Sequence, residues 1–248
     1  MSSLGVTYGS KSYKILKAGL STKGKSTGAS TGSTRFQDFG AYEEAVENSS
    51  RFYSEHSNSD SWSGELTNAE YKAIYGYTGN DYTSINGALY TKNYEDMTPS
   101  MQHKVDNIVS GLSKFELDRG IQVTRQCDFK IFGAKSGEKM TVSQVKAFIK
   151  ANADPKDGTL ENKGFLSFGS NNHGAAIDGS GLVIHAKVPP SKGAGAYVNP
   201  ISQHKGGSEN EWLFNSHSRF KFDLSSIRVD SYGKIHINAI WKGRGKHK

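Results

Sequence analysis

The spacing of apolar residues changes near residue 120, and this change constrains the fold more than any other feature of the chain. In residues 99–113, apolar side chains recur every three or four positions, which is the period of an amphipathic helix. In residues 121–125, apolar and polar side chains alternate, which is the period of a strand with one buried face. Helices first and strands afterwards predict an α+β domain.

The individual elements follow from these two periods. We predict helices over residues 36–56, 67–78, 82–90, 99–113 and 142–150, and strands over residues 121–125, 164–168, 181–188, 211–215, 219–222 and 234–241. The second helix has a capping box, because Thr67 precedes it and Glu70 lies three residues further on, and it stops at residues 78–80. No G-x-G-x-x-G motif follows a strand, so a Rossmann dinucleotide site is not expected.

The basic residues that produce the net charge of +7 are concentrated in two tails. Residues 1–35 and 242–248 contain no acid, and the body between them has a small negative charge. A fold that follows nucleic-acid phosphates needs a basic face on the body itself, so we expect nucleic-acid contact only through the tails. The composition predicts a disordered basic tail over residues 1–35, one folded domain over residues 36–242 and a basic tail over residues 243–248.

Several other classes are excluded by simple counts. Cys127 is the single cysteine, so no internal disulfide forms. No apolar run approaches the length of a membrane span, and the chain is expected to be soluble. The eight histidines include no H-E-x-x-H motif, so no metal site is expected. Residues 19–26 match a phosphate-loop pattern, but a Gly- and Ser-rich stretch follows where that loop requires a helix.

Two acids precede the apolar residues of the strand predicted at residues 211–215. A Gly-Gly turn leads to Glu209 and Glu211, and the period of a strand places both carboxylates on one face. Two carboxylates close together in a cleft repel each other, which raises the proton affinity of one of them. The pattern indicates an acid/base or cation-clamping site, and a solvated strand start is the alternative interpretation.

Three strands of the second half carry an ordered arginine, serine and glutamate set, formed by Arg125, Ser167 and the acids Glu209 and Glu211. With this set the sequence resembles the mono-ADP-ribosyltransferase toxin family, specifically the branch of clostridial Rho-modifying exoenzymes, iota-type toxins and vegetative insecticidal toxins. The resemblance covers about residues 36–242. Further matching motifs lie at residues 62–89, Val105–Ile108, Phe132–Gly133 and Gly195–Tyr197.

The resemblance implies a single domain in which N-terminal helices pack on a two-sheet, mainly antiparallel β-core. It also implies roles for particular residues. Arg125 would bind an NAD phosphate, with Arg119 as the second choice. Ser167 would hold the strands around the nicotinamide pocket and hydrogen-bond the catalytic glutamate. Glu211 would bind the ribose 2′-hydroxyl and stabilise the cation that forms as nicotinamide leaves. The residues that would contact NAD from the helices are Tyr77, Tyr82 and Asn86.

The acceptor is implied by Glu209. Family members with glutamate at this position modify arginine, and a second carboxylate can hold a guanidinium and take its proton. The expected reaction is transfer of ADP-ribose from NAD to an arginine of a target protein, without a metal. We expect a monomer that is secreted or delivered into another cell, as a toxin, an injected effector or a phage protein.

The chain departs from the family pattern at several positions. Ser167–Phe168–Gly169 replaces the usual Ser-Thr-Ser, and the family's stacking phenylalanine and second phosphate arginine fall on Asp178 and Gly181. Candidates to replace them are Phe168, His173 and Lys187. Residues 198–208 form a loop two residues longer than in the insecticidal toxins. These departures keep two alternatives open, namely a degenerate fold that binds a partner and an enzyme that modifies nucleic acid.

Overall fold

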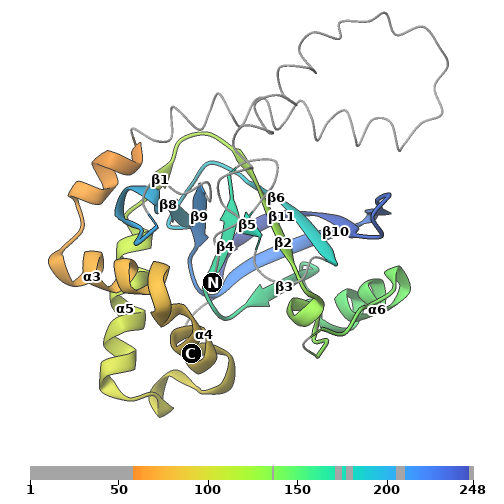
Figure 1. The fold of residues 1–248 in the computed structure, drawn as a ribbon, viewed down its shortest axis with the longest axis horizontal. Coiled ribbons are helices and arrows are strands. Elements are labelled where there is room, and N and C mark those ends of the chain that lie inside the picture. Colours follow the sequence, from red (N-terminus) through yellow and green to blue (C-terminus); the bar gives the residue numbers. More distant parts are fainter. Residues whose placement is uncertain (1–57, 136, 171–174, 177–180, 205–209, 246–248) are drawn as a thin grey trace, which may run out of the picture.

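The structure is a computed structural model, and it describes residues 58–135, 137–170, 175–176, 181–204 and 210–245 (Figure 1). The helix predicted over residues 36–56 and the tail predicted over residues 1–35 lie outside the described residues, as do residues 246–248. None of the described helices has the length and apolar character needed to cross a membrane.

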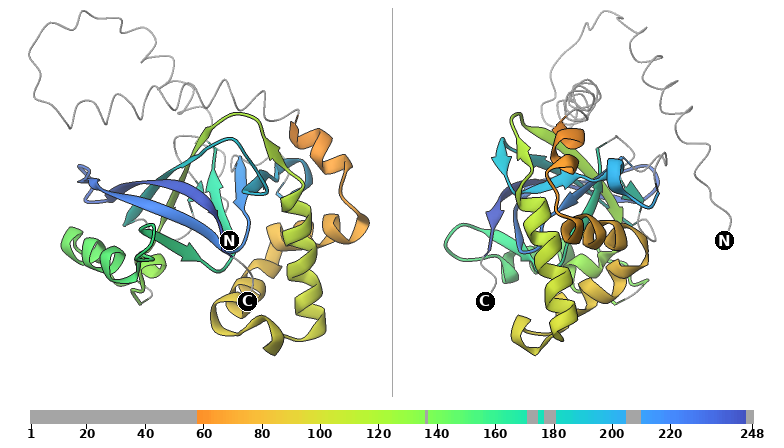
Figure 2. Two further views of the ribbon diagram at one scale, coloured as in Figure 1. Left: turned by 180° about the vertical axis from the view of Figure 1, so that it is seen from behind. Right: turned by 90° about the vertical axis from the view of Figure 1, so that its left-hand side faces the viewer.

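The first half of the described chain is helical, as predicted. Its helices are α3 (Asn68–Gly76), α4 (Tyr82–Thr91) and α5 (Pro99–Ser113), and α6 (Val142–Asn152) follows later in the chain. The capping box of α3 is confirmed: Glu70 N donates to Thr67 Oγ1 at 3.3 Å, and Thr67 N donates to Glu70 Oε2 at 2.7 Å. Figure 1 and the left view of Figure 2 both show α3, α4 and α5 on one side of the strands and α6 on the other.

The stop predicted at residues 78–80 is a change of helix type. Between α3 and α4 the chain forms the π-helical turn Tyr77–Asp81, in which Gly79 has the non-helical angles φ −98° and ψ −110°. Thr78 Oγ1 donates to Tyr75 O at 2.9 Å within this turn. The turn redirects the helix axis and presents residues from both helices to the same side.

The second half forms a mainly antiparallel β-core in two parts. The strands are β1 (Glu116–Leu117), β2 (Ile121–Cys127), β3 (Thr159–Asn162), β4 (Leu166–Gly169), β5 (Ala175–Ala176), β6 (Leu182–Val188), β7 (Ser191–Lys192), β8 (Gly195–Tyr197), β9 (Glu211–Phe214), β10 (Ser218–Val229) and β11 (Ile235–Arg244). In the part of the chain that the structure describes, a nine-stranded sheet follows the order β3-β10-β11-β6-β2-β4-β9-β8, with β5 paired to β2, and β1 and β7 form a separate two-stranded sheet. The two parts of the long sheet, β3-β10-β11-β6-β2 and β4-β9-β8, meet at β2 and β4. The only β2–β4 register pair joins Thr124 to Gly169. The predicted fold class is confirmed.

Aromatic side chains fill the space between the two parts. Phe168 on β4 lies 5.0 Å from Phe214 on β9 and 6.3 Å from Phe220 on β10, measured between ring centroids. Trp212 packs edge-on against Phe115 at 5.4 Å. Each of these rings is almost completely buried, and burial of such a side chain contributes about 1.5–3 kcal/mol. The strand parts are therefore held together mainly by apolar packing.

Strand lengths differ from those predicted. The strand predicted over residues 219–222 extends to Val229 because the register shifts between Asp223 and Arg228 and pairing then resumes. In this irregular part Asp223 Oδ1 accepts a hydrogen bond from Ser225 N at 2.9 Å. The alternation of apolar and polar residues, on which the prediction depended, is interrupted at this register shift. The short strands β1, β3, β5, β7 and β8 were not predicted from the sequence. Of these, β3 and β8 lie at the two ends of the long sheet.

Candidate active site

Ser167 and Glu211 lie on adjacent antiparallel strands and share a face. Ser167 on β4 is opposite Leu213 on β9, and Gly169 is opposite Glu211, so Ser167 and Glu211 are diagonal neighbours. Ser167 Oγ donates to Glu211 Oε1 at 2.5 Å. Gly169, which has no side chain, occupies the position directly opposite Glu211. Glu211 is only 7% exposed.

Arg125 joins this pair from β2. Its Nη1 donates to the main-chain oxygen of Ser167 at 2.6 Å, which brings the predicted arginine, serine and glutamate into one cluster. The Nε atom of Arg125 is buried and has no hydrogen-bond partner within the described part of the chain. A guanidinium has five N–H donors, so this side chain keeps donors available for an anion.

The helical wall of the site is formed by Tyr77 and Asn86. Asn86 Nδ2 donates to Tyr77 Oη at 3.0 Å and to Phe165 O at 3.1 Å, and Phe165 N donates to Asn86 Oδ1 at 2.9 Å. Burial, reinforced by the nearby Glu211 carboxylate, raises the pKa of Tyr77 far above its ordinary value, so the phenol stays neutral. Asn86 therefore ties α4 to the chain that enters β4.

A cavity of about 720 Å³ lies beside this cluster. Its lining includes five residues selected from the sequence, namely Tyr77, Tyr82, Asn86, Arg125 and Ser167. Its volume lies within the roughly 300–1,000 Å³ usual for ligand pockets. Lining residues that the sequence analysis did not select include Tyr90, Asp128, Lys130, Glu161 and Lys163. Only the fold brings these five to the cavity, because they come from α4, the 3-10 turn that follows β2, strand β3 and the turn after β3.

The shared strand face expected for Glu209 and Glu211 stays a prediction. β9 begins at Glu211, and Asn210 before it has a φ of 42°, which is the left-handed region rather than an extended strand. Asn210 therefore lies outside the extended strand, and the two-residue period of β9 holds from Glu211 onwards. Asn210 is held in this conformation by its main-chain oxygen, which accepts from Ser170 N at 2.9 Å. Glu209 itself lies outside the described residues.

Arg119 and the candidates to replace the family's stacking phenylalanine and second phosphate arginine do not line the large cavity where the structure describes them. Arg119 is exposed in the turn before β2 and does not line the large cavity. The expectation that Phe168 stacks on nicotinamide is wrong, because its ring is 1% exposed and packs in the core. Lys187 is exposed on β6 and is not among the residues that line the cavity. His173 and Asp178 lie outside the described residues.

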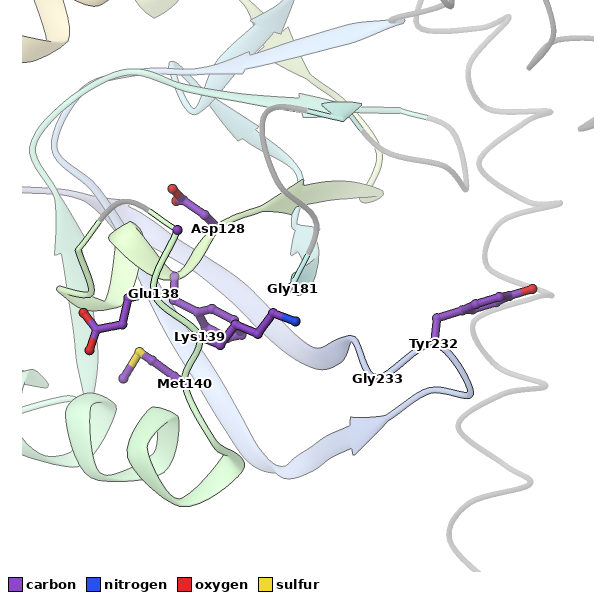
Figure 3. Close-up of a pocket in the computed structure, with 9 residues that line it drawn as sticks. Asp128, Glu138, Lys139, Met140, Gly181, Tyr232 and Gly233 are labelled. Carbon is purple, nitrogen blue, oxygen red and sulfur yellow. The ribbon is translucent and has the colours of Figure 1, made fainter.

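A second, smaller cavity of about 180 Å³ lies next to the first and shares Asp128 with it (Figure 3). Gly181 lines this cavity, and a Cβ atom at Gly181 would lie 2.6 Å from a ring carbon of Phe129. Figure 3 shows Tyr232 directed away from the other lining residues. No group of three or more possible metal ligands occurs within the described ranges.

The chain is similar to known proteins both in sequence and in fold. Residues 54–242 match the sequence model of a family described as ADP-ribosyltransferase exoenzyme. The comparison with curated proteins found no match. Among solved structures, the chain is similar to Plx2a, an ADP-ribosyltransferase toxin from Paenibacillus larvae. That match has 24% identity and a TM-score of 0.62, and it covers 79% of this chain and 97% of that one.

Two further structures show the same fold. The C3 exoenzyme of Clostridium limosum matches with 20% identity and a TM-score of 0.60, over 77% of this chain and 95% of that one. The ADP-ribosylating toxin BECa of C. perfringens, solved with NADH, matches with 24% identity and a TM-score of 0.61. That match covers 79% of this chain and 48% of BECa.

Proposed function

Because this chain belongs to the ADP-ribosyltransferase exoenzyme family, whose activity is ADP-ribosyl transfer from NAD, we propose that its acceptor is an arginine side chain of a target protein. The observation that carries the proposal is the cluster of Arg125, Ser167 and Glu211 beside the large cavity. Glu209, two residues before Glu211 in the sequence, supplies the second carboxylate that an arginine acceptor requires.

The proposed mechanism begins with binding and bond cleavage. Arg125 binds a phosphate of NAD through its free guanidinium donors. The bond between nicotinamide and the ribose C1′ breaks, and its electron pair leaves with nicotinamide. The Glu211 carboxylate stabilises the positive charge that develops on the ribose, and the Ser167 hydroxyl holds this carboxylate in place. The low exposure of Glu211 strengthens this interaction, because little water screens it.

Transfer to the acceptor completes the reaction. A guanidinium nitrogen of the target arginine attacks C1′ and forms the new carbon–nitrogen bond. Glu209 takes the proton that this nitrogen loses, so charge and atoms balance. An arginine side chain is protonated at neutral pH, which is why the acceptor step needs a base in addition to Glu211.

The test incubates the full chain with labelled NAD and a lysate, and measures nicotinamide release together with labelled protein. We expect release of nicotinamide and a label that hydroxylamine removes, as an arginine linkage requires. Glu211→Gln should lower the rate by about 100- to 1,000-fold, whereas the exposed Glu116→Gln should not. Label that resists hydroxylamine would overturn the arginine acceptor, and intact NAD at high protein concentration would overturn the activity.

A further inference from the structure

The large cavity contains more positive charge than its own acids neutralise. The cations among its lining residues are Arg125, Lys130 and Lys163, and the acids are Asp128 and Glu161. Lys130 Nζ lies 3.2 Å from Asp128 Oδ2, and His217 Nδ1 lies 2.5 Å from Glu161 Oε1. Asp128 is therefore paired with Lys130, and Glu161 contacts His217. Among the cations of the lining, Arg125 and Lys163 have no ion-pair partner within the described residues.

The pyrophosphate of NAD is neutralised by two cations. The pyrophosphate of NAD has two negative charges, and one guanidinium neutralises only one of them. The position at which the family pattern places a second arginine is Gly181, where a Cβ atom would lie 2.6 Å from the Phe129 ring. Phe129 is 3% exposed and cannot move aside without disturbing its packing. The second cation therefore has to come from another element.

The main chain around Lys163 is held firmly, whereas its side chain is exposed. Asn162 Nδ2 donates to Gly164 O at 2.6 Å, and His217 N donates to Lys163 O at 3.3 Å. Gly164 allows α4 to approach closely, since a Cβ atom there would lie 2.9 Å from the Tyr90 hydroxyl. Lys163 Nζ has no ion-pair partner among the residues that the structure describes. A fixed backbone with a free ammonium group suits the binding of an anion.

Arg125 and Lys163 line the same cavity. Arg125 is bound to the main-chain oxygen of Ser167, and Lys163 precedes Ser167 by four residues. Four residues span about 14 Å at most, so two long side chains that line one cavity can converge on a single ligand. We propose that Lys163 binds the pyrophosphate of NAD together with Arg125, in place of the arginine that Gly181 excludes. This proposal rests on the proposed use of NAD as substrate.

The test measures NAD binding to the full chain by calorimetry. Lys163→Met removes the charge but keeps much of the apolar stem, and we expect the dissociation constant for NAD to rise by about 10- to 100-fold. Lys163→Arg should remain within about threefold of the wild type, because it keeps the charge. Lys72→Met is the matched control: Lys72 is exposed on α3, lies outside the cavity lining and changes the net charge equally.

A second measurement identifies the part of NAD that is recognised. Adenosine and nicotinamide riboside contain no phosphate, so their affinities should be equal for the wild type and Lys163→Met. The affinity of the wild type for NAD should also fall more steeply with added salt than that of Lys163→Met.

The outcomes separate this proposal from the function on which it rests. If the wild type binds NAD and Lys163→Met binds it as tightly as Lys72→Met does, the assignment of Lys163 is overturned and the proposed function stands. If the wild type binds no NAD, both are overturned. A loss of affinity for adenosine equal to that for NAD would show a structural effect, and would overturn the phosphate contact.

Discussion

The hydroxyl of Ser167 on β4 donates a 2.5 Å hydrogen bond to the carboxylate of Glu211 on β9. The two strands are antiparallel, and Ser167 and Glu211 are diagonal neighbours in their register. Ser167 therefore orients the Glu211 carboxylate. Gly169 occupies the position directly opposite Glu211 on the neighbouring strand.

Ser167→Ala should therefore lower the rate of nicotinamide release by about 10- to 100-fold, since it removes a hydrogen bond to a charged group. The effect should fall mainly on kcat, because the bond orients Glu211 and does not hold the substrate. The matched control is Ser191→Ala, which removes an exposed hydroxyl that donates to Pro189 O at 2.9 Å. Equal rates for the two variants would contradict the role of Ser167.

Glu209→Gln tests the choice of acceptor. We expect this variant to release nicotinamide from NAD in the absence of a target at close to the wild-type rate. Transfer to a protein arginine should fall by about 100-fold or more, because the amide cannot accept the proton of the guanidinium. The two rates are measured on one preparation with labelled NAD. A variant that loses both rates equally would place Glu209 in bond cleavage instead of acceptor binding.

Asn86→Ala should affect both stability and substrate binding. The substitution removes three hydrogen bonds that join α4 to Tyr77 and Phe165, at 2.9 to 3.1 Å. We expect the free energy of unfolding to fall by about 1–3 kcal/mol, and the melting temperature to fall by about 2–4 °C per kcal/mol. Tyr77→Phe removes the bond from Asn86 Nδ2 and the longer bond from Tyr77 Oη to Phe165 O at 3.3 Å, and should have a smaller effect. Calorimetry with and without NAD measures both.

Stability should decrease as the solution becomes acidic, because two partly buried histidines contact each other. His185 Nε2 lies 3.0 Å from His236 Nδ1, and Thr124, Arg228 and Asp230 surround the pair. Burial lowers the pKa of His185 to about 3, with a further contribution from His236, and burial also lowers the pKa of His236. Between pH 6.5 and about 3 the unfolded chain binds more protons than the folded one, so stability is lost as pH falls.

The measurement is the free energy of unfolding by denaturant across this pH range. We expect a slope of up to about 1.4 kcal/mol per pH unit from His185, and a reduced slope in the double variant His185→Gln, His236→Gln. His103→Gln, which changes an exposed histidine of α5, is the control. An unchanged slope in the double variant would show that other groups cause the acid sensitivity.

Glu70→Gln should destabilise the helical half at neutral pH. Burial alone would raise the pKa of Glu70, but hydrogen bonds from Lys114, Ser110 and Thr67 outweigh it and lower that pKa to about 2. The carboxylate therefore contributes stability that is complete above pH 4.5 and is lost as pH falls towards 2. We expect a loss of about 1–3 kcal/mol at pH 7. The exposed Glu65→Gln should have no such effect, and equal unfolding energies for the two variants would contradict the prediction.

The sequence alone determined the features that depend on neighbouring residues. Thr67 and Glu70 form a capping box because a helix brings positions three residues apart together. The periods of apolar residues located α4, α5 and α6, and the motifs around Arg125 and Ser167 identified the family, which the family comparison confirms.

The tertiary structure decided the features that depend on residues far apart in the chain. Glu211 meets Ser167 through strand pairing, and Asn210 leaves the strand because contacts with Ser170 hold it in a left-handed conformation. Lys163 lines the cavity only because the β3–β4 turn packs against α4. The period of apolar residues shows which face of an element is buried, but not which elements pack against each other. The candidate site is formed by residues from elements that pack together, so its composition depends on the tertiary structure.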